Sequence, residues 1–246
     1  MTPSRPRPSR RPPAASAPGF TLVEAMVVVA IVLILSALVI SSLARSKPRA
    51  NLANATLELH GLLHQARQAA LSGGVPVSVL VYRTYAPPGA GSPGYFVVYQ
   101  DACFDFFTGG GTCGVSYAAY DPANLAVGSA GTTRSAVLDT MTLPSGVIIG
   151  PATGMGAGAA LNAPLAGIVV NLDCSFCGTT GGAVQFDPRG QATFYSLAGG
   201  FQAGPLAVNG GASLTLGYDP AVTTVTGQRT LVVLSASGAV QIISGG

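Results

Sequence analysis

The strongest feature of the hydrophobic pattern is an apolar run from Gly19 to Leu43, GFTLVEAMVVVAIVLILSALVISSL. Between Phe20 and Ala44 the run contains one charged residue, Glu24. At a helical rise of ~1.5 Å per residue, a run of this length covers the ~30 Å hydrocarbon core of a bilayer. The pattern therefore predicts a transmembrane helix. A carboxylate near its start is costly in lipid and needs a reason to be there.

A second helical pattern follows Pro48 and extends from about Arg49 to Leu71. Pro48 should bend or interrupt the helix. Apolar or small residues recur every three or four positions on one face, namely Leu52, Thr56, Leu59, Leu63, Ala66 and Ala70. The opposite face carries Asn54, Glu58, Gly61, Gln65 and Gln68. The pattern predicts an amphipathic helix that lies on a sheet and ends at Ser72-Gly73-Gly74.

Beyond Gly74 the period changes to that of β-strands. The candidates are Val75–Tyr82, Tyr95–Tyr99, Val147–Ile149, Gly167–Asn171, Ala183–Phe186, Ala192–Leu197, Ser213–Tyr218, Arg229–Ser235 and Ala239–Ile243. Asp187-Pro188-Arg189-Gly190 fits a type I turn in a hairpin, and Ser235-Ala236-Ser237-Gly238 joins the last two strands in the same way. Short turns between successive strands favour an antiparallel sheet.

These patterns predict an α+β protein in which a long N-terminal helix, half transmembrane and half amphipathic, packs on an antiparallel β-sheet head. The expected divisions are a leader over 1–19, the transmembrane helix over 20–45 and the head over 46–246. The stretches from about Thr84 to Thr142 and from Gly150 to Pro164 are rich in Gly, Pro and Ala. We expect long loops there, where a partner surface is most plausible.

The order of parts around Gly19 differs from that of a secretory signal peptide, whose cleavage site follows the apolar region. Here the small residue Gly19 precedes it. Cleavage between Gly19 and Phe20 would keep the helix in the mature chain and create an α-amino group four residues from Glu24. The string GFTLVE next to an uninterrupted apolar helix closely resembles the processing site of type IV pilins and type II secretion pseudopilins.

This resemblance implies a membrane peptidase that cuts after Gly19 and methylates the new N-terminal Phe20. It also implies that Glu24 pairs with the N-terminal amine of a neighbouring subunit in a helical filament. The string FDPRGQA and the terminal hairpin RTLVVLSASG make the chain similar to the GspH/FimT group of minor pseudopilins and minor pilins. Similarity to that group covers roughly half of the chain.

The net charge of +3 is misleading, because four of the 12 basic residues lie before Gly19. Without that leader, eight basic residues face nine acidic ones, and the near-neutral chain gives no support to nucleic-acid binding. The leader supplies a positive cytoplasmic flank. Arg45, Lys47 and Arg49 on the far side weaken this charge rule, so orientation depends on the cleavage site.

Four cysteines, Cys103, Cys113, Cys174 and Cys177, lie in the part expected to be exported. An even number in an oxidising compartment predicts disulfides, with three possible connectivities. The local pairing of Cys103 with Cys113 and Cys174 with Cys177 is favoured. A four-thiolate zinc site is the alternative, because Cys174 and Cys177 have C-x₂-C spacing. A thioredoxin-type redox role is disfavoured, since a Gly-rich segment follows Cys177.

Two further pairs of residues have ligand character. His60 and His64 are four apart on the amphipathic helix, which is metal-ligand spacing, but we interpret them as two half-exposed histidines beside Arg67. Asp101 and Asp105 could join a calcium loop. The residues between them include Cys103 and Phe104, which are not calcium ligands, so the two acids alone are weak support for such a site. We expect no metal site and no cofactor.

Enzyme signatures are absent from the sequence. Gly89–Gly94 reads as G-x-G-x-x-G, but it contains Pro93 and opens no helix, so a loop is expected. There is no G-x-S-x-G, HExxH or P-loop motif, and both histidines lie on the assembly helix. The sequence therefore predicts a non-enzymatic protein.

By its resemblance, the chain is expected to be a minor pseudopilin of a type II secretion pseudopilus, anchored once in the inner membrane with its head in the periplasm. Expected partners are other pseudopilins, the prepilin peptidase, the inner-membrane assembly platform, and lipid before assembly. The alternative is a minor pilin in pilus assembly or DNA uptake. DNA binding needs clustered basic residues, whereas Arg134, Arg189 and Arg229 are scattered and the C-terminus carries none.

Overall fold

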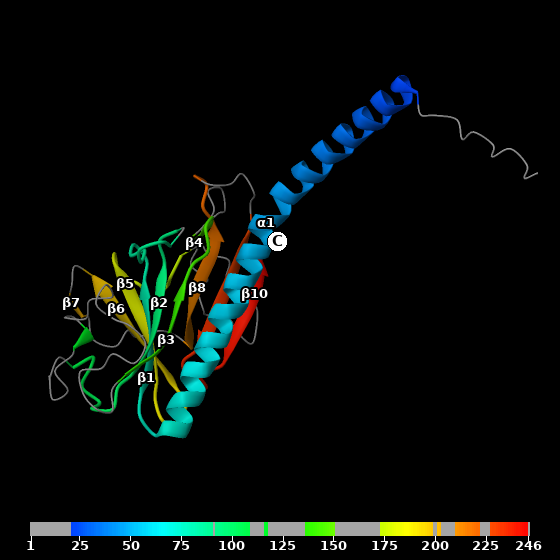
Figure 1. Ribbon diagram of the computed structural model, residues 1–246. Helices are drawn as coiled ribbons and strands as arrows, with labels where there is room; N and C mark the ends of the chain where they lie inside the picture. The colour runs from blue at the N-terminus through cyan, green and yellow to red at the C-terminus, as the bar shows by residue number, and fades with distance from the viewer. Residues whose placement is uncertain are drawn as a thin grey trace, which may run out of the picture. The chain divides into compact units, whose positions relative to one another are not determined.

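A computed structural model describes residues 21–90, 92–108, 116–117, 136–150, 173–198, 201–202, 210–221 and 227–245 (Figure 1). The chain forms two compact units, Met1–Ala44 and Arg45–Gly246. The first contains the apolar half of helix α1, and the second contains the rest of α1 and all the strands.

Helix α1 extends from Leu22 to Gly73 and is 52 residues long. The sequence-based expectation is that Pro48 bends or interrupts the helix. Pro48 lies inside α1, so the interruption is wrong. Proline removes a single backbone donor, and this loss does not end the helix here. The C-terminal end of α1, at Gly73, lies where the sequence predicts it. Gly74 donates its N–H to the carbonyl oxygen of Ala70 at 3.1 Å and adopts a left-handed φ of 64°, as a C-terminal glycine cap requires.

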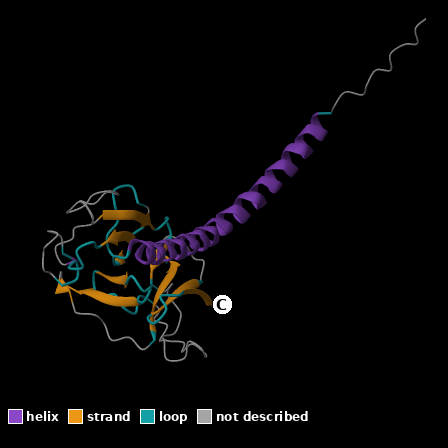
Figure 2. Ribbon diagram, turned by 90° about the horizontal axis from the view of Figure 1, so that it is seen from below, coloured by secondary structure: helices purple, strands orange, loops and turns teal. Residues whose placement is uncertain are grey.

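The amphipathic half of α1 buries the predicted stripe. All six stripe residues from Leu52 to Ala70 are buried, and Ala55 and Leu62 join them. The five residues assigned to the opposite face, from Asn54 to Gln68, are exposed. Figure 2 shows strands gathered about the C-terminal turns of α1. The helical period therefore identified the packed face correctly.

The strands form two antiparallel sheets, which confirms the α+β class. The six-stranded sheet has the order β3-β2-β1-β5-β6-β7. Its strands are β1 (Val77–Tyr82), β2 (Tyr95–Gln100), β3 (Ala136–Thr142), β5 (Gly181–Phe186), β6 (Ala192–Ala198) and β7 (Phe201–Gln202). The four-stranded sheet, in the order β10-β9-β8-β4, contains β4 (Val147–Ile149), β8 (Gly211–Tyr218), β9 (Gln228–Leu234) and β10 (Val240–Gly245).

Every predicted strand within the described residues matches an observed strand to within two residues at each end, and Gly167–Asn171 lies outside those residues. Strands β3 and β7 were not predicted, and β3 lies in a stretch expected to be loop. The register between β2 and β3 shifts at Val98/Tyr99, so that Tyr99 pairs with Val137 and Val98 with Asp139. This bulge breaks the period of two that identifies a strand.

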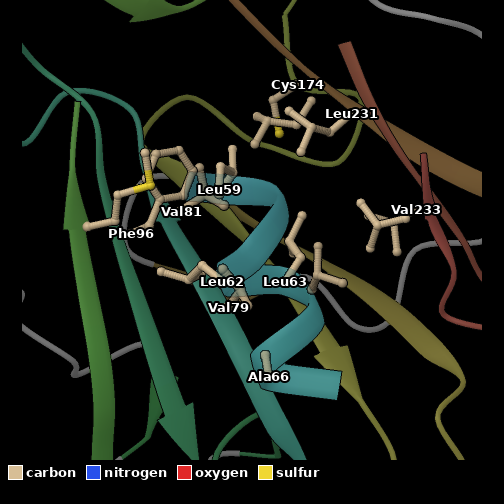
Figure 3. Close-up of a cluster of buried hydrophobic side chains, with 14 of the residues drawn as sticks. Leu59, Leu62, Leu63, Ala66, Val79, Val81, Phe96, Cys174, Leu231 and Val233 are labelled. Carbon is tan, nitrogen blue, oxygen red and sulfur yellow. The ribbon is translucent and has the colours of Figure 1, made fainter. Parts of the chain in front are cut away.

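The main core fills the space between α1 and both sheets. In Figure 3 the side chains of Leu59 and Leu63 lie between residues of the two sheets. The six-stranded sheet contributes Val79, Val81 and Phe96, and the four-stranded sheet contributes Leu231 and Val233. Burial of this apolar surface is the main term that holds the helix to the strands.

A second core covers the other face of the six-stranded sheet. Leu80 and Tyr82 of β1 point into it, whereas Val79 and Val81 belong to the main core. Its lid is aromatic: Phe106 stacks on Tyr99 at 4.3 Å between ring centroids, and Phe107 stacks on Tyr195 at 3.8 Å. Because both faces are covered, all six residues of β1 are buried.

The two sheets are joined where two hairpin turns meet the helix. Arg67 of α1 donates its Nε–H to the carbonyl oxygen of Gly190, in the β5–β6 turn, at 3.4 Å. Gly190 also forms the predicted turn, because its N–H bonds the carbonyl oxygen of Asp187 at 2.9 Å. Nearby, Ala192 of β6 donates to the carbonyl oxygen of Ser235 after β9, at 2.8 Å.

Candidate functional site

The N-terminal segment carries the candidate processing and assembly residues. Gly19 and Phe20 lie outside the described residues, which begin with Thr21. Thr21 precedes the first helical residue and caps α1. Its Oγ1 accepts the backbone N–H of Glu24 at 3.2 Å, and its carbonyl oxygen accepts the N–H of Ala25 at 3.2 Å. An N-cap threonine satisfies a donor that the first helical turn leaves unpaired.

Glu24 is the acidic residue of the first turn of α1. Thr21-Leu22-Val23-Glu24 has the T-x-x-E spacing of a capping box. A carboxylate here also interacts favourably with the positive end of the helix dipole. Local helix physics therefore gives Glu24 a favourable place in an otherwise apolar segment.

The following residues form one apolar helix long enough to cross a membrane, Leu22–Ile40. None of this span is buried in the structure, and Leu22 is 78% exposed. The hydroxyl of Ser36 donates to the carbonyl oxygen of Val32 at 2.7 Å, so this polar group is satisfied within the helix. The arrangement offers a long apolar surface with a single negative charge near its start, consistent with a membrane anchor.

The family described as "Prokaryotic N-terminal methylation motif" has a model that matches residues 16–40. The chain carries the methylation motif of prepilin-like proteins. This motif supports a type IV pilin-like or pseudopilin subunit, and it indicates a structural subunit rather than an enzyme. No curated protein and no solved structure matches the chain. The match contains Gly19, Phe20 and Glu24 and ends before the head.

Among the cysteines, Cys174 and Cys177 form a disulfide with a Cα–Cα distance of 5.2 Å. Cys103 is also disulfide-bonded, whereas Cys113, its expected partner, lies outside the described residues. The described part of the chain contains no group of three or more His, Cys, Asp or Glu arranged to hold a metal. With two of its sulfurs bonded to each other, the four-thiolate zinc alternative does not fit.

Arg83 fixes the segment around the Cys174–Cys177 disulfide. Its Nη2 forms an ion pair with the carboxylate of Asp173, and its Nη1 donates to the carbonyl oxygen of Gly178 at 3.5 Å. Burial raises the pKa of Asp173, and Arg83 acts against this increase. The sequence analysis missed this contact, because Arg83 and Asp173 are 90 residues apart with no shared motif.

The histidine pair lies as the sequence indicates. His60 and His64 are half-buried, and their rings meet edge to face at 4.5 Å between centroids. Burial lowers the pKa of His64, and the neighbouring His60 and Arg67 lower it further. Within the described chain this pair has no third ligand nearby that would complete a metal site.

Asp101 has a structural role in the loop that covers the second core. It is 2% exposed, and its carboxylate oxygens accept the backbone N–H groups of Cys103 and Phe106, each at 3.2 Å. Burial is the main cause that raises the pKa of Asp101, and the nearby Asp105 adds to it. Because these oxygens already hold the loop, the geometry does not favour a calcium site. The Gly89–Gly94 string lies between β1 and β2, as expected for a loop.

Proposed function

We propose that this chain is a minor pseudopilin, a structural subunit of a type II secretion pseudopilus that takes part in the export of folded proteins across the outer membrane. The observation that carries the proposal is the methylation motif over residues 16–40, which is continuous with an exposed apolar helix. The α+β head with two antiparallel sheets is compatible with the GspH/FimT group.

The first proposed step is cleavage between Gly19 and Phe20 by a prepilin peptidase, followed by methylation of the Phe20 amine. The helix begins at Leu22 and is capped by Thr21. In the sequence, the bond proposed to be cut precedes Thr21, the residue that caps the helix.

The second step is assembly, in which Glu24 pairs with the N-terminal amine of a neighbouring subunit. The exposed faces of Leu22–Ile40 would pack against other apolar helices in the filament. In such surroundings, burying an unpaired carboxylate or an unpaired amine costs free energy. Pairing the two opposite charges offsets part of this cost. The interaction would favour one axial register between neighbouring helices.

The proposed location is the inner membrane, with a single crossing, the N-terminus in the cytoplasm and the head in the periplasm. Lipid surrounds the helix before assembly, and other pseudopilins surround it afterwards. The inner-membrane assembly platform would extract the subunit from the bilayer. The role is mechanical, because a growing filament would push or gate folded substrates.

A minor pilin in pilus assembly or DNA uptake is the alternative, since the matched motif is common to prepilin-like proteins. Of the arginines considered for DNA binding, Arg189 lies in the β5–β6 turn and Arg229 in β9, so they belong to different sheets. Arg134 lies outside the described residues. Nucleic acid is therefore not the favoured partner.

Deletion of the gene in its host tests the proposal. We expect export of folded proteins to fail while surface pili and DNA uptake persist, and re-expression of the full chain should restore export. Loss of pili or of DNA uptake with normal export would support the minor pilin alternative and contradict the pseudopilin assignment.

A further inference from the structure

The two histidines of the chain, His60 and His64, lie on successive turns of the amphipathic half of α1. Residues four apart on a helix lie on one face, with Cβ atoms ~5–6 Å from each other. Neutral imidazole is a common ligand of transition metals, and a helix that presents two of them at this spacing can hold one ion between them. The pair therefore has the composition and the spacing of a bidentate metal ligand.

The distance between the two rings fits a shared metal ion. Their centroids are 4.5 Å apart. With metal–nitrogen bonds of ~2.0–2.1 Å, two imidazoles on one ion have centroids roughly 4.5–5 Å apart. The backbone therefore does not have to move to bring both rings to one ion. This distance changes the interpretation of the pair as two half-exposed histidines without a ligand role.

The orientation of the rings requires one adjustment. They meet edge to face with 62° between their planes, so a nitrogen of each ring must turn towards a common point. The χ2 torsion of histidine is broad, and both side chains are half-buried rather than enclosed. Among the described residues, neither imidazole has a hydrogen-bond partner that would oppose the rotation.

The surface beside the pair has room for an ion and its water ligands. Gly61 lies between the histidines in the sequence, and nothing lies within 4 Å of the position of an added Cβ there. Leu57 and Gln65 on this part of the helix are exposed as well. The described part of the chain adds no third ligand, so water would fill the other positions of a tetrahedral shell.

Arg67 is the basic residue that opposes a cation here, because it lies one turn beyond His64. Its Nε–H donates to the carbonyl oxygen of Gly190 at 3.4 Å, which holds the guanidinium group against the β5–β6 turn. Repulsion between charges at an exposed site is weak in water and is further reduced by salt. Arg67 therefore lowers the affinity for a cation without closing the site.

We propose that His60 and His64 chelate one divalent transition-metal ion of the class that prefers imidazole, such as Zn²⁺ or Cu²⁺. The two-nitrogen donor set disfavours Ca²⁺ and Mg²⁺, which prefer oxygen ligands. The bound ion would link two successive turns of α1. By mass action it would stabilise the folded head, in which the helical spacing of the two ligands exists. The inference concerns the head alone and does not rest on the proposed function.

The test measures Zn²⁺ binding to the full-length chain, purified in detergent micelles without a histidine tag. The measurement is made at about pH 7.5, where an imidazole of ordinary pKa is mostly neutral. Because the chain has two histidines, imidazole ligands can come from this pair alone. Zn²⁺ is titrated in competition with a chromophoric chelator. Electron paramagnetic resonance of bound Cu²⁺ then shows whether two nitrogen ligands are present.

We expect the parent chain to bind one Zn²⁺ ion through both histidines. His60→Gln and His64→Gln should each weaken binding by at least about tenfold, because the second ligand no longer acts at a high local concentration. The matched control combines His64→Gln with Gln65→His. It keeps two imidazoles but separates them by ~140° around the helix, at ~100° per residue, so it should bind as weakly as the single variants.

The stability of the head gives a second measurement. Saturating Zn²⁺ should raise the urea midpoint of the parent chain and leave that of the register-shifted control unchanged. Ca²⁺ at the same concentration should change neither midpoint, because the donor set contains no carboxylate.

Equal Zn²⁺ binding by the parent and the register-shifted control would overturn the inference, since isolated histidines would then explain the signal. The inference also fails if the double variant His60→Gln/His64→Gln binds as tightly as the parent. Competition by Ca²⁺ as strong as that by Cu²⁺ would assign the ion to carboxylate ligands and contradict the histidine site. These results do not depend on the methylation motif, so the proposed function is tested separately.

Discussion

The hydroxyl of Thr21 accepts the backbone N–H of Glu24 at 3.2 Å. This hydrogen bond caps α1, which begins at Leu22. The capping residue therefore lies three residues before Glu24, the acidic residue of the apolar span. The same short string therefore holds the proposed cleavage site, the helix cap and the proposed assembly charge. Local helix physics explains why Thr21 and Glu24 are three residues apart, since that spacing is the capping-box spacing.

Replacing Thr21 tests the cap. Thr21→Ala removes the side-chain acceptor and should destabilise the first turn of α1 by ~1 kcal/mol, the usual value of an N-cap. The amide hydrogens of Glu24 and Ala25 should then exchange about fivefold faster in detergent micelles, as measured by NMR. Thr21→Ser keeps the hydroxyl and should exchange like the parent. Equal exchange in Thr21→Ala would show that the cap does not stabilise this turn.

Replacing Glu24 separates membrane insertion from assembly. Glu24→Ala should insert more easily, because it removes the one charge in the span. In the filament, however, it would leave a neighbour's amine unpaired, and breaking one side of a buried pair costs ~3–5 kcal/mol. The variant should be processed and held in the membrane normally, yet be under-represented in sheared or cross-linked filament fractions.

Glu24→Gln is the matched variant, since it keeps the shape and loses the charge, and it should show the same defect. Normal incorporation of both variants would mean that Glu24 pairs with no neighbouring amine. A subunit at the filament tip would give that result.

The two hairpin turns meet at Gly190 and Gly238, and we expect a side chain at Gly238 to destabilise the head. A Cβ atom at Gly238 would lie 2.1 Å from the carbonyl oxygen of Gly190, and Gly238 has a left-handed φ of 61°. Gly238→Ala should therefore lower the free energy of unfolding by ~2–3 kcal/mol, since both the clash and the backbone conformation oppose a side chain. Urea denaturation of the head, followed by circular dichroism, measures the change.

Gly61→Ala is the control for this measurement. Gly61 is exposed on α1, and nothing lies within 4 Å of the position of an added Cβ. Alanine in the interior of a helix is favoured over glycine by ~0.5–1 kcal/mol, so Gly61→Ala should stabilise the head. If the two variants had similar stability, the close contact between Gly238 and Gly190 would be refuted.

His64 predicts a pH dependence of stability. Its ordinary pKa is 6.5, and burial, His60 and Arg67 lower the pKa in the folded head. The unfolded chain therefore binds more protons between the two pKa values, and stability is lost as the pH falls through the unfolded value. Relative to His64→Gln, the parent should become less stable as the pH falls through the ordinary pKa of 6.5. Parallel stability curves for the two proteins would contradict a lowered pKa at His64.

The sequence predicted those parts of the fold that depend on a regular local pattern. The stripe from Leu52 to Ala70 follows the helical period, and the turn at Asp187-Pro188-Arg189-Gly190 follows from the conformational limits of proline and glycine. Strand β3 was missed because the bulge at Val98/Tyr99 disturbs the alternation that identifies a strand. The alternation of a β-strand can be recognised in a single sequence only where the strand pairs with its neighbour without a bulge.

Contacts between distant segments were not predictable in the same way. The aromatic lid on the second core depends on Phe107 meeting Tyr195, and nothing in either local sequence specifies that meeting. The Arg83–Asp173 ion pair is a similar case. In contrast, the candidate processing site could be recognised in the sequence from Gly19 to Glu24, because its residues form one continuous motif. A partner surface on the head has no such linear signature.

The intact mass and N-terminal sequence of the chain extracted from host membranes test the account most directly. Cleavage and methylation should give a mature chain that begins with N-methylated Phe20, and replacement of Gly19 by a bulky residue should leave the full-length precursor. A parent chain that keeps its leader, or that begins at any residue other than Phe20, would contradict the account.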